Sequence, residues 1–490
     1  MIRITVNDEM FAYDMYHIIK AFCPGEEIEQ KVNKGNLPIV QIQLEDCDGK
    51  NEYFEINASE PVELSERKLR KHYVNTKVYQ RMREITGKIL AWGIMTGVRP
   101  TKPMMAMMDA GASDGETVAW MKEHYCVTDE KAKLGLAVAK KEKELLAQLD
   151  YKDGYSLYIG IPFCPTTCSY CSFTSYPITE WKHRVDKYLD AVCKELTAIA
   201  TFCKGKKLNT VYIGGGTPTT LEADQMDRLL SKLEQAFSFE ELKEITVEAG
   251  RPDSITREKL EVLKKHNIGR ISINPQTMQQ KTLDVIGRRH TVEDIRRTYH
   301  MARELGFDNI NMDLIAGLPG ETAEDMEDTL KQIMELGPDS LTVHALAMKR
   351  ASRLSQEQKG KERNENEEAE IAKTLSKMIE MASEAASEMK LEPYYLYRQK
   401  NIAGNFENVG YAKVDKAGIY NILIMEEKQS IIAVGAGAST KIVVPEDKVV
   451  VDPKTGNPKK ILRVENVRDI EQYISRIDEM IERKGELLWH

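Results

Sequence analysis

The spacing of apolar residues changes near residue 150 and separates regions of different character. Before that point, alternating apolar and polar positions predict short strands over 1–6, 39–44 and 53–56. A helical period predicts helices over 65–95 and 114–149. These elements together indicate a small N-terminal α+β region over residues 1–150, whose role the sequence does not reveal.

From residue 157 onward, short β-branched runs alternate with amphipathic helical stretches. Strands are predicted over 157–161, 210–213, 244–248, 270–273, 310–315 and 340–343. Helices are predicted over 180–203, 223–236, 257–265, 292–305 and 323–334. This order of strand–helix units indicates a parallel sheet with right-handed crossovers. A complete eight-fold barrel would need two more units, so we expect an α/β fold with a partial, open (β/α)6 barrel over residues 151–350.

The chain beyond residue 350 has a mixed pattern. The strongly polar stretch 352–370 indicates a mobile insertion or lid, and a long helix is predicted over 368–389. Residues 393–444 are rich in glycine and in strand-forming runs, the clearest of which are 420–425 and 431–438. A final helix is predicted over 466–484. We therefore expect a C-terminal α+β extension over residues 351–490.

Composition narrows the classes of function. The 490 residues contain 69 Lys and Arg against 77 Asp and Glu, and this net charge of −8 argues against a nucleic-acid partner. The N-terminus lacks the apolar core of a signal peptide, and no apolar run approaches the roughly 18 residues of a membrane helix. We therefore expect a cytoplasmic protein without a membrane span, in which thiols stay reduced.

A glycine-containing turn over residues 92–102 separates the two helical stretches of the first region. Its sequence, WGIMTGVRPTK, contains two glycines, a proline and two cations. The segment could bind an anion, or it could be a capping turn that connects two helices, and we favour the connecting turn.

Three of the eight cysteines are closely spaced, at Cys164, Cys168 and Cys171. Zinc usually takes four ligands in two pairs, and no second pair lies nearby in the sequence. A disulfide would need an oxidising compartment. Three thiolates suit a [4Fe–4S] cubane with one iron left open to the amino and carboxylate groups of a substrate. The loop follows the first barrel strand, at the end of the barrel where active sites lie.

Glycine-rich or polar segments also follow the later strands. They are Gly214-Gly215-Gly216-Thr217 after the second strand, Glu248 at the end of the third, Gln276 after the fourth, Arg288 in the next turn and Asp313 within the fifth. Consecutive glycines let backbone groups approach a charged ligand closely. A guanidinium can clamp a carboxylate, and a buried carboxylate needs a partner. Their order along the strand ends indicates one common site.

The segment Tyr158-Ile159-Gly160-Ile161-Pro162-Phe163, followed by the three cysteines, resembles the radical S-adenosylmethionine superfamily. More narrowly, residues 155–440 resemble the oxygen-independent coproporphyrinogen III oxidase (HemN-like) family, and they best fit its HemZ-type branch. By that resemblance, the residues that bind S-adenosylmethionine are Gly215, Gly216, Thr217, Glu248, Gln276, Arg288 and Asp313, and those that line its amine and adenine pockets are Tyr158, Tyr170, Ile315 and Ala347.

The resemblance also implies an activity, the oxidative decarboxylation of coproporphyrinogen III to protoporphyrinogen IX in haem biosynthesis. We accordingly expect a monomeric radical S-adenosylmethionine oxidoreductase with a small-molecule tetrapyrrole substrate and an electron donor such as flavodoxin or ferredoxin. Two alternatives stay open. One is a haem-binding chaperone of the same family, and the other is a radical enzyme that acts on another tetrapyrrole such as haem.

Several residues bear on the choice between these functions. Gly160 stands where the family has a histidine, and Phe173 stands where the well-studied oxidases have a further cysteine. Phe173 instead matches the haem-chaperone and HemZ-type branches. The aromatic and cationic segment 395–401 could bind an acidic tetrapyrrole or be an ordinary strand. His290 and His344 are candidate haem ligands for a chaperone.

Overall fold

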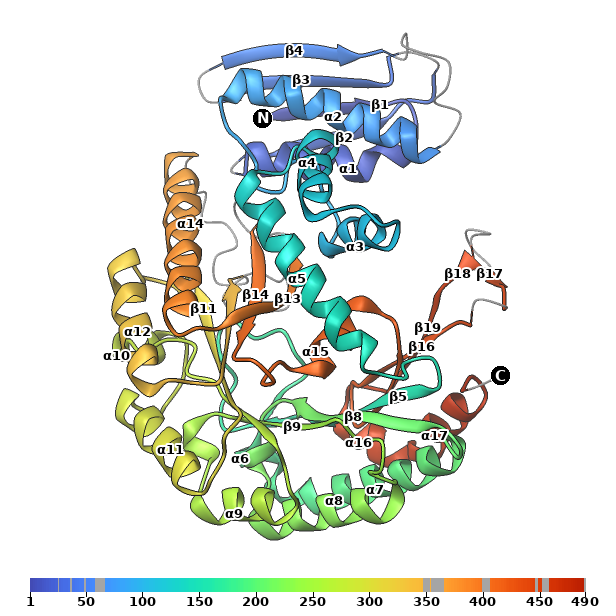
Figure 1. Ribbon diagram of the computed structural model, residues 1–490, viewed down its shortest axis with the longest axis vertical. Coiled ribbons are helices and arrows are strands. Elements are labelled where there is room, and N and C mark those ends of the chain that lie inside the picture. Colours follow the sequence, from blue (N-terminus) through green and yellow to red (C-terminus); the bar gives the residue numbers. More distant parts are fainter. Residues whose placement is uncertain are drawn as a thin grey trace.

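The computed structural model describes residues 1–24, 26–35, 38–47, 50–57, 67–346, 353, 365–398, 406–445, 448–451 and 458–488. Figure 1 shows a small sheet with its helices at one end of the molecule and a larger, curved sheet with helices along its outer side. No helix within these ranges is long and apolar enough to cross a membrane.

The N-terminal region contains a four-stranded sheet in the order β2-β1-β3-β4. Its elements are β1 (Ile2–Val6), α1 (Glu9–Phe22), β2 (Ile28–Val32), β3 (Val40–Cys47), β4 (Lys50–Ile56) and α2 (Arg67–Thr86). Alternate residues of β1 are buried in one cluster with apolar residues of α1 and α2. The three predicted strands are confirmed, whereas α1 and β2 were not predicted.

The two long helices predicted in this region are interrupted. Helix α2 ends at Thr86, and the stretch 114–149 forms α4 (Asp114–Tyr125) and α5 (Asp129–Ala147). Between them Cys126 has a left-handed backbone with φ of 57°, and Thr128 caps α5. A left-handed residue ends a helix without changing the apolar period, so the periodicity alone could not locate this break.

Six parallel strands form the partial barrel. They are β5 (Gly154–Ile161), β8 (Lys207–Gly215), β9 (Glu244–Gly250), β10 (Arg270–Ile273), β11 (Ile310–Ala316) and β12 (Ser340–Ala345). They pair in chain order, and the helices between them are α7 (Val185–Phe202), α8 (Ala223–Ala236), α9 (Arg257–Lys265), α10 (Gln280–Val285), α11 (Val292–Glu304) and α12 (Ala323–Leu336). The predicted α/β fold and strand order are confirmed.

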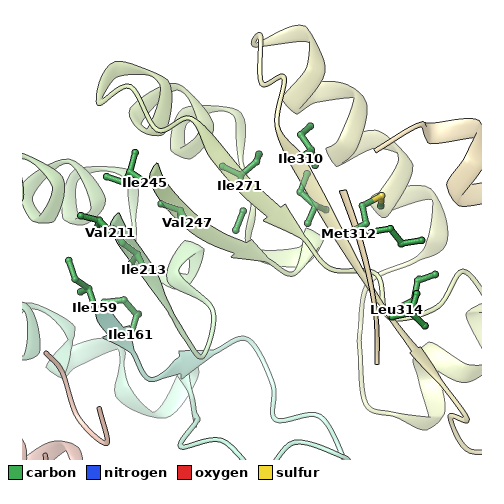
Figure 2. Packing of buried hydrophobic residues seen from close by; sticks show 14 of the residues in the cluster. Ile159, Ile161, Val211, Ile213, Ile245, Val247, Ile271, Ile310, Met312 and Leu314 are labelled. Atoms are coloured by element: carbon green, nitrogen blue, oxygen red, sulfur yellow. The ribbon is translucent and has the colours of Figure 1, made fainter. Parts of the chain in front are cut away.

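Side chains on the barrel strands alternate between two environments. Figure 2 shows Val211 and Ile213 of β8 together with the equivalent apolar residues of neighbouring strands, and all belong to one buried cluster that includes the helices. The residues between them, such as Tyr212 on β8 and Asn311 on β11, line a cavity on the opposite face. Because successive residues of a strand point to opposite faces, one strand builds the core and the site together.

Strands from the C-terminal segment extend the sheet at both edges, giving eleven strands. β13 (Glu392–Arg398) and β14 (Glu407–Ala412) lie beyond β12, and β15 (Ser430–Val434), β16 (Ser439–Val443) and β19 (Ile461–Glu465) lie beyond β5. The helices of this segment are α14 (Glu365–Glu388), α15 (Ile419–Glu426), α16 (Ile470–Ser475) and α17 (Ile477–Gly485). The predicted lid over 352–370 lies largely outside the described residues. The divisions at residues 150 and 350 stay predictions.

The prediction of a strand over 420–425 is wrong, because these residues belong to helix α15. Glu244 at the start of β9 accepts hydrogen bonds from the backbone N–H groups of Ile419 (2.5 Å) and Tyr420 (3.3 Å). A carboxylate that accepts from the first N–H groups of a helix stabilises its N-terminus. Since this partner lies about 175 residues away, the local pattern could not reveal it.

The turn over 92–102 connects the N-terminal region to the C-terminal segment. Arg99 Nη1 donates to Met425 O (2.9 Å), and Nη2 pairs with Glu427 (2.7 Å). Trp92 Nε1 donates to the buried carboxylate of Glu407 (2.7 Å). Arg99 is thus paired with groups of the chain itself, which favours the interpretation of the segment as a connecting turn over that as an anion-binding loop.

We predict that Glu142 on α5 makes folding stability fall as pH rises. Its side chain is fully buried, and burial followed by the nearby charge of Glu426 raises the pKa of Glu142 well above its ordinary value of 4.5. The folded chain therefore holds a proton that the unfolded chain releases, and stability is lost from about pH 5 upward by at most about 1.4 kcal/mol per pH unit. In denaturant unfolding at several pH values, Glu142→Gln should flatten this decline, whereas the exposed Glu144→Gln should not. Equal slopes in both variants would contradict the assignment.

Candidate functional site

The polar faces of the barrel strands and part of the C-terminal segment enclose a cavity of about 400 Å³. The predicted site residues that line it are Cys164, Cys168, Tyr170, Cys171, Gly215, Gly216, Thr217, Glu248, Gln276, Arg288, Asp313 and Ile315. Tyr158 lies behind this lining, and Ala347 lies outside the described residues. The fold thus brings together residues from five strand ends, while their individual roles stay predictions.

The cysteine loop leaves β5 and is tied to the turn that follows α10. Ser169 N donates to Ile286 O (3.1 Å), and Thr166 Oγ1 donates to Gly287 O (2.9 Å). These two bonds fix the loop from the far side of the barrel mouth. The loop is therefore held by a turn that lies more than 100 residues away in the sequence.

The three thiols of the loop suit an iron–sulfur cubane better than a single metal ion. Burial raises the pKa of Cys164 to about 11, a hydrogen bond from Thr217 opposes this shift, and the neighbouring Cys171 and Cys168 add to it. The thiols therefore lie close enough to influence one another. Among the described residues, no three Cys, His, Asp or Glu side chains are grouped tightly enough for one metal ion. A cubane instead takes each thiolate on a different iron.

The glycine loop after β8 packs directly on the chain that enters the cysteine loop. Gly216 N donates to Ile161 O (2.8 Å), and Thr217 N donates to Phe163 O (2.7 Å). The hydroxyl of Thr217 lies 3.5 Å from Cys164 Sγ and donates to it. A Cβ on Gly216 would lie 2.5 Å from Phe163 O, so only glycine allows this approach.

Glu248 faces the cavity from the end of β9. It accepts a hydrogen bond from Tyr212 Oη at 2.5 Å. Burial raises the pKa of Glu248 to about 7, the Tyr212 hydrogen bond opposes the shift, and Asp313 adds to it. A carboxylate with this pKa changes its charge close to neutral pH and gains most from a cationic ligand.

Gln276 has an unusual backbone that joins β10 to β11. Its φ of 68° is rare for a residue other than glycine. Gln276 N donates to Asp313 O (2.9 Å), and Ile315 N donates to Gln276 O (2.9 Å). The carboxylate of Asp313 accepts from Asn311 Nδ2 (2.7 Å). Strained backbone of this kind gathers at functional sites.

Arg288 is a buried guanidinium with one nitrogen left for a ligand. Nη1 donates to Asn274 O, and Nη2 donates to Tyr170 Oη at 3.2 Å. Its Nε is buried and has no hydrogen-bond partner within the described residues. A buried donor of this kind needs an acceptor, and a ligand carboxylate would supply one.

Three stacked tyrosines stand at one wall of the cavity, and of these Tyr212 lines it. The rings of Tyr212 and Tyr420 are stacked with centroids 4.5 Å apart, and Tyr158 stacks beside both. Tyr212 lines the cavity but was not predicted as a site residue, and Tyr420 packs behind it. The alternation on β8 could have indicated Tyr212, because it points to the same face as Gly214, whereas Tyr420 depends on the unpredicted helix α15.

The C-terminal segment 395–401 divides between two faces. Tyr395 and Tyr397 line the cavity, but Arg398 points away from it and donates to Met95 O (2.6 Å). Arg398 is thus a structural contact with the N-terminal region and not a cavity cation. Residues 399–401 lie outside the described residues. Of the two candidate histidines, His344 lines the cavity and His290 is buried outside its lining.

The comparison with protein families gives the class of protein. The model of the radical SAM superfamily matches residues 158–333, which contain the cysteine loop and the barrel strands up to β11. Proteins of this superfamily use a [4Fe–4S] cluster and S-adenosylmethionine. The three thiols, the glycine loop and the unpaired Nε of Arg288 fit these two cofactors.

Individual relatives narrow the class. The oxygen-independent coproporphyrinogen-III oxidase-like protein HemZ of Bacillus subtilis is 41% identical over 429 residues, which are 86% of this chain and 82% of the relative. The haem chaperone HemW of the same organism is 37% identical over 39% of this chain and 50% of its own length. Escherichia coli coproporphyrinogen III oxidase (HemN) has a similar fold, with a TM-score of 0.51 and 23% identity over 71% of this chain and 73% of that one. The chain belongs to the HemN-like family of radical SAM proteins.

We predict that Gly216→Ala weakens the attachment of the cysteine loop. Its Cβ would overlap Phe163 O, and relieving such a contact costs about 1–3 kcal/mol. Iron counted per chain after anaerobic reconstitution should fall several-fold. Gly269→Ala, where a Cβ meets nothing within 4 Å, is the matched control and should keep its full iron content. An equal iron content in both variants would show that the loop does not depend on this close approach.

Proposed function

We propose that this protein is a radical S-adenosylmethionine oxidoreductase that decarboxylates propionate side chains of coproporphyrinogen III to give protoporphyrinogen IX. The observation that carries the proposal is the single cavity in which the cysteine loop, the polar strand ends and an aromatic C-terminal strand meet. The extensive identity to HemZ, which is named as coproporphyrinogen-III oxidase-like, supports it.

In the proposed site, Cys164, Cys168 and Cys171 hold the cluster. When bound, the cluster and S-adenosylmethionine together supply a 5′-deoxyadenosyl radical. The chain's contribution begins with binding and orientation, because a radical must form next to the hydrogen that it removes. The glycine loop supplies backbone groups beside Cys164, and its contacts with the chain before the loop keep both parts in register.

Three charged side chains suit the polar groups of S-adenosylmethionine. Glu248 accepts from the amino group, Arg288 donates from Nε to the carboxylate, and Asp313 accepts from a ribose hydroxyl. The surroundings support the first two roles, because Glu248 and Arg288 are buried and a buried charge gains most from an opposite partner. The backbone of Gln276 holds the Asp313 region in place.

The aromatic part of the cavity suits the tetrapyrrole. The rings of Tyr395 and Tyr397 are nearly parallel, at an angle of 9°, and offer flat apolar surfaces. In the reaction, a propionate carbon gives up a hydrogen atom, the carboxylate leaves as carbon dioxide, one electron passes to an acceptor, and a vinyl group forms. An electron donor such as flavodoxin or ferredoxin supplies the electron that starts each cycle.

A haem chaperone is the second candidate function, and two observations favour it. His344 lines the cavity, where its Nδ1 lies 3.2 Å from Tyr397 Oη. Phe173, which stands where the well-studied oxidases have a cysteine, is 69% exposed at the cavity and cannot supply a thiol there. Similarity to HemW agrees with this alternative but covers only 39% of the chain.

An anaerobic assay separates these functions. The full chain is reconstituted with iron and sulfide, then mixed with S-adenosylmethionine, dithionite and coproporphyrinogen III, and the products are identified by mass spectrometry. We expect protoporphyrinogen IX and 5′-deoxyadenosine. Deoxyadenosine without decarboxylated product would refute the proposed substrate and keep the radical chemistry, whereas haem binding without deoxyadenosine would favour the chaperone. Cys168→Ala should abolish every product.

We predict that binding of S-adenosylmethionine strengthens with pH through the ionisation of Glu248. The pKa of Glu248 is raised to about 7 by burial, so its carboxyl group is mostly protonated at lower pH and carries no negative charge to attract the ligand's amino group. Affinity measured by calorimetry should rise about fivefold between about pH 6 and about pH 7. Glu248→Gln should bind more weakly and show a flat profile. A variant that keeps the wild-type pH dependence would assign the effect to another group.

A further inference from the structure

Arg251 is a buried arginine beside the cysteine loop, and no sequence motif singled it out. It directly follows Gly250, the last residue of β9, and its side chain is only 3% exposed. It also belongs to the lining of the cavity. An arginine so fully buried requires partners for its charge, and those partners indicate the role of the side chain.

One edge of the Arg251 guanidinium is fixed by a carboxylate. Nε donates to Asp253 Oδ1 (3.0 Å), and Nη2 donates to Asp253 Oδ2 (2.6 Å). Asp253 Oδ1 in turn lies 3.6 Å from Nδ1 of the buried His290. A bidentate pair of this kind fixes the plane of the guanidinium as well as its position.

The other edge of the guanidinium points at the cysteine loop. Nη1 donates to the carbonyl oxygen of Thr166 (2.8 Å) and to its hydroxyl (2.7 Å), and it lies 3.9 Å from Cys168 Sγ, to which it also donates. Thr166 is the residue that is tied to Gly287 on the far side of the barrel. Arg251 therefore holds the loop and directs a positive charge at one of the three thiols.

A cation that donates to a thiolate ligand acts on the redox properties of the bound cluster. Hydrogen bonds to sulfur and the local net charge are among the factors that set the potential of iron–sulfur clusters. Reduction adds one negative charge to the cluster, and a nearby guanidinium stabilises the reduced form more than the oxidised form. The effect is larger in a buried site, where the charge is poorly screened.

We propose that Arg251, fixed by Asp253, is a positioning residue that raises the reduction potential of the cluster through Cys168. This inference rests on the proposed ligation of the cluster by Cys164, Cys168 and Cys171. The step concerned is the uptake of one electron from dithionite or a reduced electron-transfer protein. No bond is formed or broken in the protein, and the guanidinium keeps its protons throughout.

The test is a redox titration of the reconstituted full chain without substrate, followed by electron paramagnetic resonance of the reduced cluster. Arg251→Gln removes the charge and keeps a polar side chain. Arg251→Lys keeps the charge but loses the pair of nitrogens that binds both carboxylate oxygens of Asp253. Arg257→Gln on the adjacent helix α9 is the control, because Arg257 is half exposed and pairs with Glu304. Iron is counted per chain in every sample.

We expect the equilibrium constant for one-electron reduction of the cluster to be about tenfold smaller in Arg251→Gln than in the wild type, which is a shift of about 59 mV to lower potential. Arg251→Lys should fall between the two, and Arg257→Gln should match the wild type. If Arg251→Gln loses its iron, the comparison rests on Arg251→Lys. An unchanged potential in an iron-loaded variant would overturn the proposal, and so would loss of iron from both Arg251 variants, because Arg251 would then only support the loop. A wild-type chain that holds no cluster would instead refute the ligation by the three cysteines.

Discussion

The alternation of side chains along six parallel strands is the constraint on which the rest of the structure depends. Apolar residues such as Val211 and Ile213 pack toward the helices, and the residues between them face the cavity. Parallel sheets are usually apolar on both faces because both are covered. Here the inner face is polar, so the stability of the barrel rests on one face of each strand. The other face is free to carry Glu248, Asp313 and their neighbours.

The cysteine loop needs support from outside the barrel, and the C-terminal segment supplies it. Gly435 lies so close to β5 that a Cβ on it would be 2.5 Å from Gly160 O, which accounts for the glycine at position 435. Tyr188 donates to Gly160 O at 2.6 Å. Glu195, fully buried on the same helix α7, accepts from Gly435 N and pairs with the buried Lys484. The last helix of the chain thus helps to position the strand that leads to Cys164.

Much of the fold and the site follows from local patterns, and the remainder depends on distant contacts. The strands of the barrel were predictable because short β-branched runs recur between amphipathic helical stretches, and the cysteines because their spacing is local. The contribution of α15 was not predictable, since Glu244 holds the start of that helix from another part of the chain. The same holds for Arg398, whose direction away from the cavity is set by Met95 and Trp92 in the N-terminal region. Arg251 was not predicted as a site residue because its contact with Cys168 forms only in the folded chain.

The contact of Arg99 with Met425 has a consequence for how the parts of this chain can change in evolution. Met425 lines the cavity, and its backbone oxygen is held by an arginine of the N-terminal region. Part of the cavity wall in the last third of the chain is therefore supported from behind by the first third. Exchange of the N-terminal region for that of another protein would alter the wall, even though none of its described residues lines the cavity. The N-terminal region is therefore less modular than its separate sheet suggests.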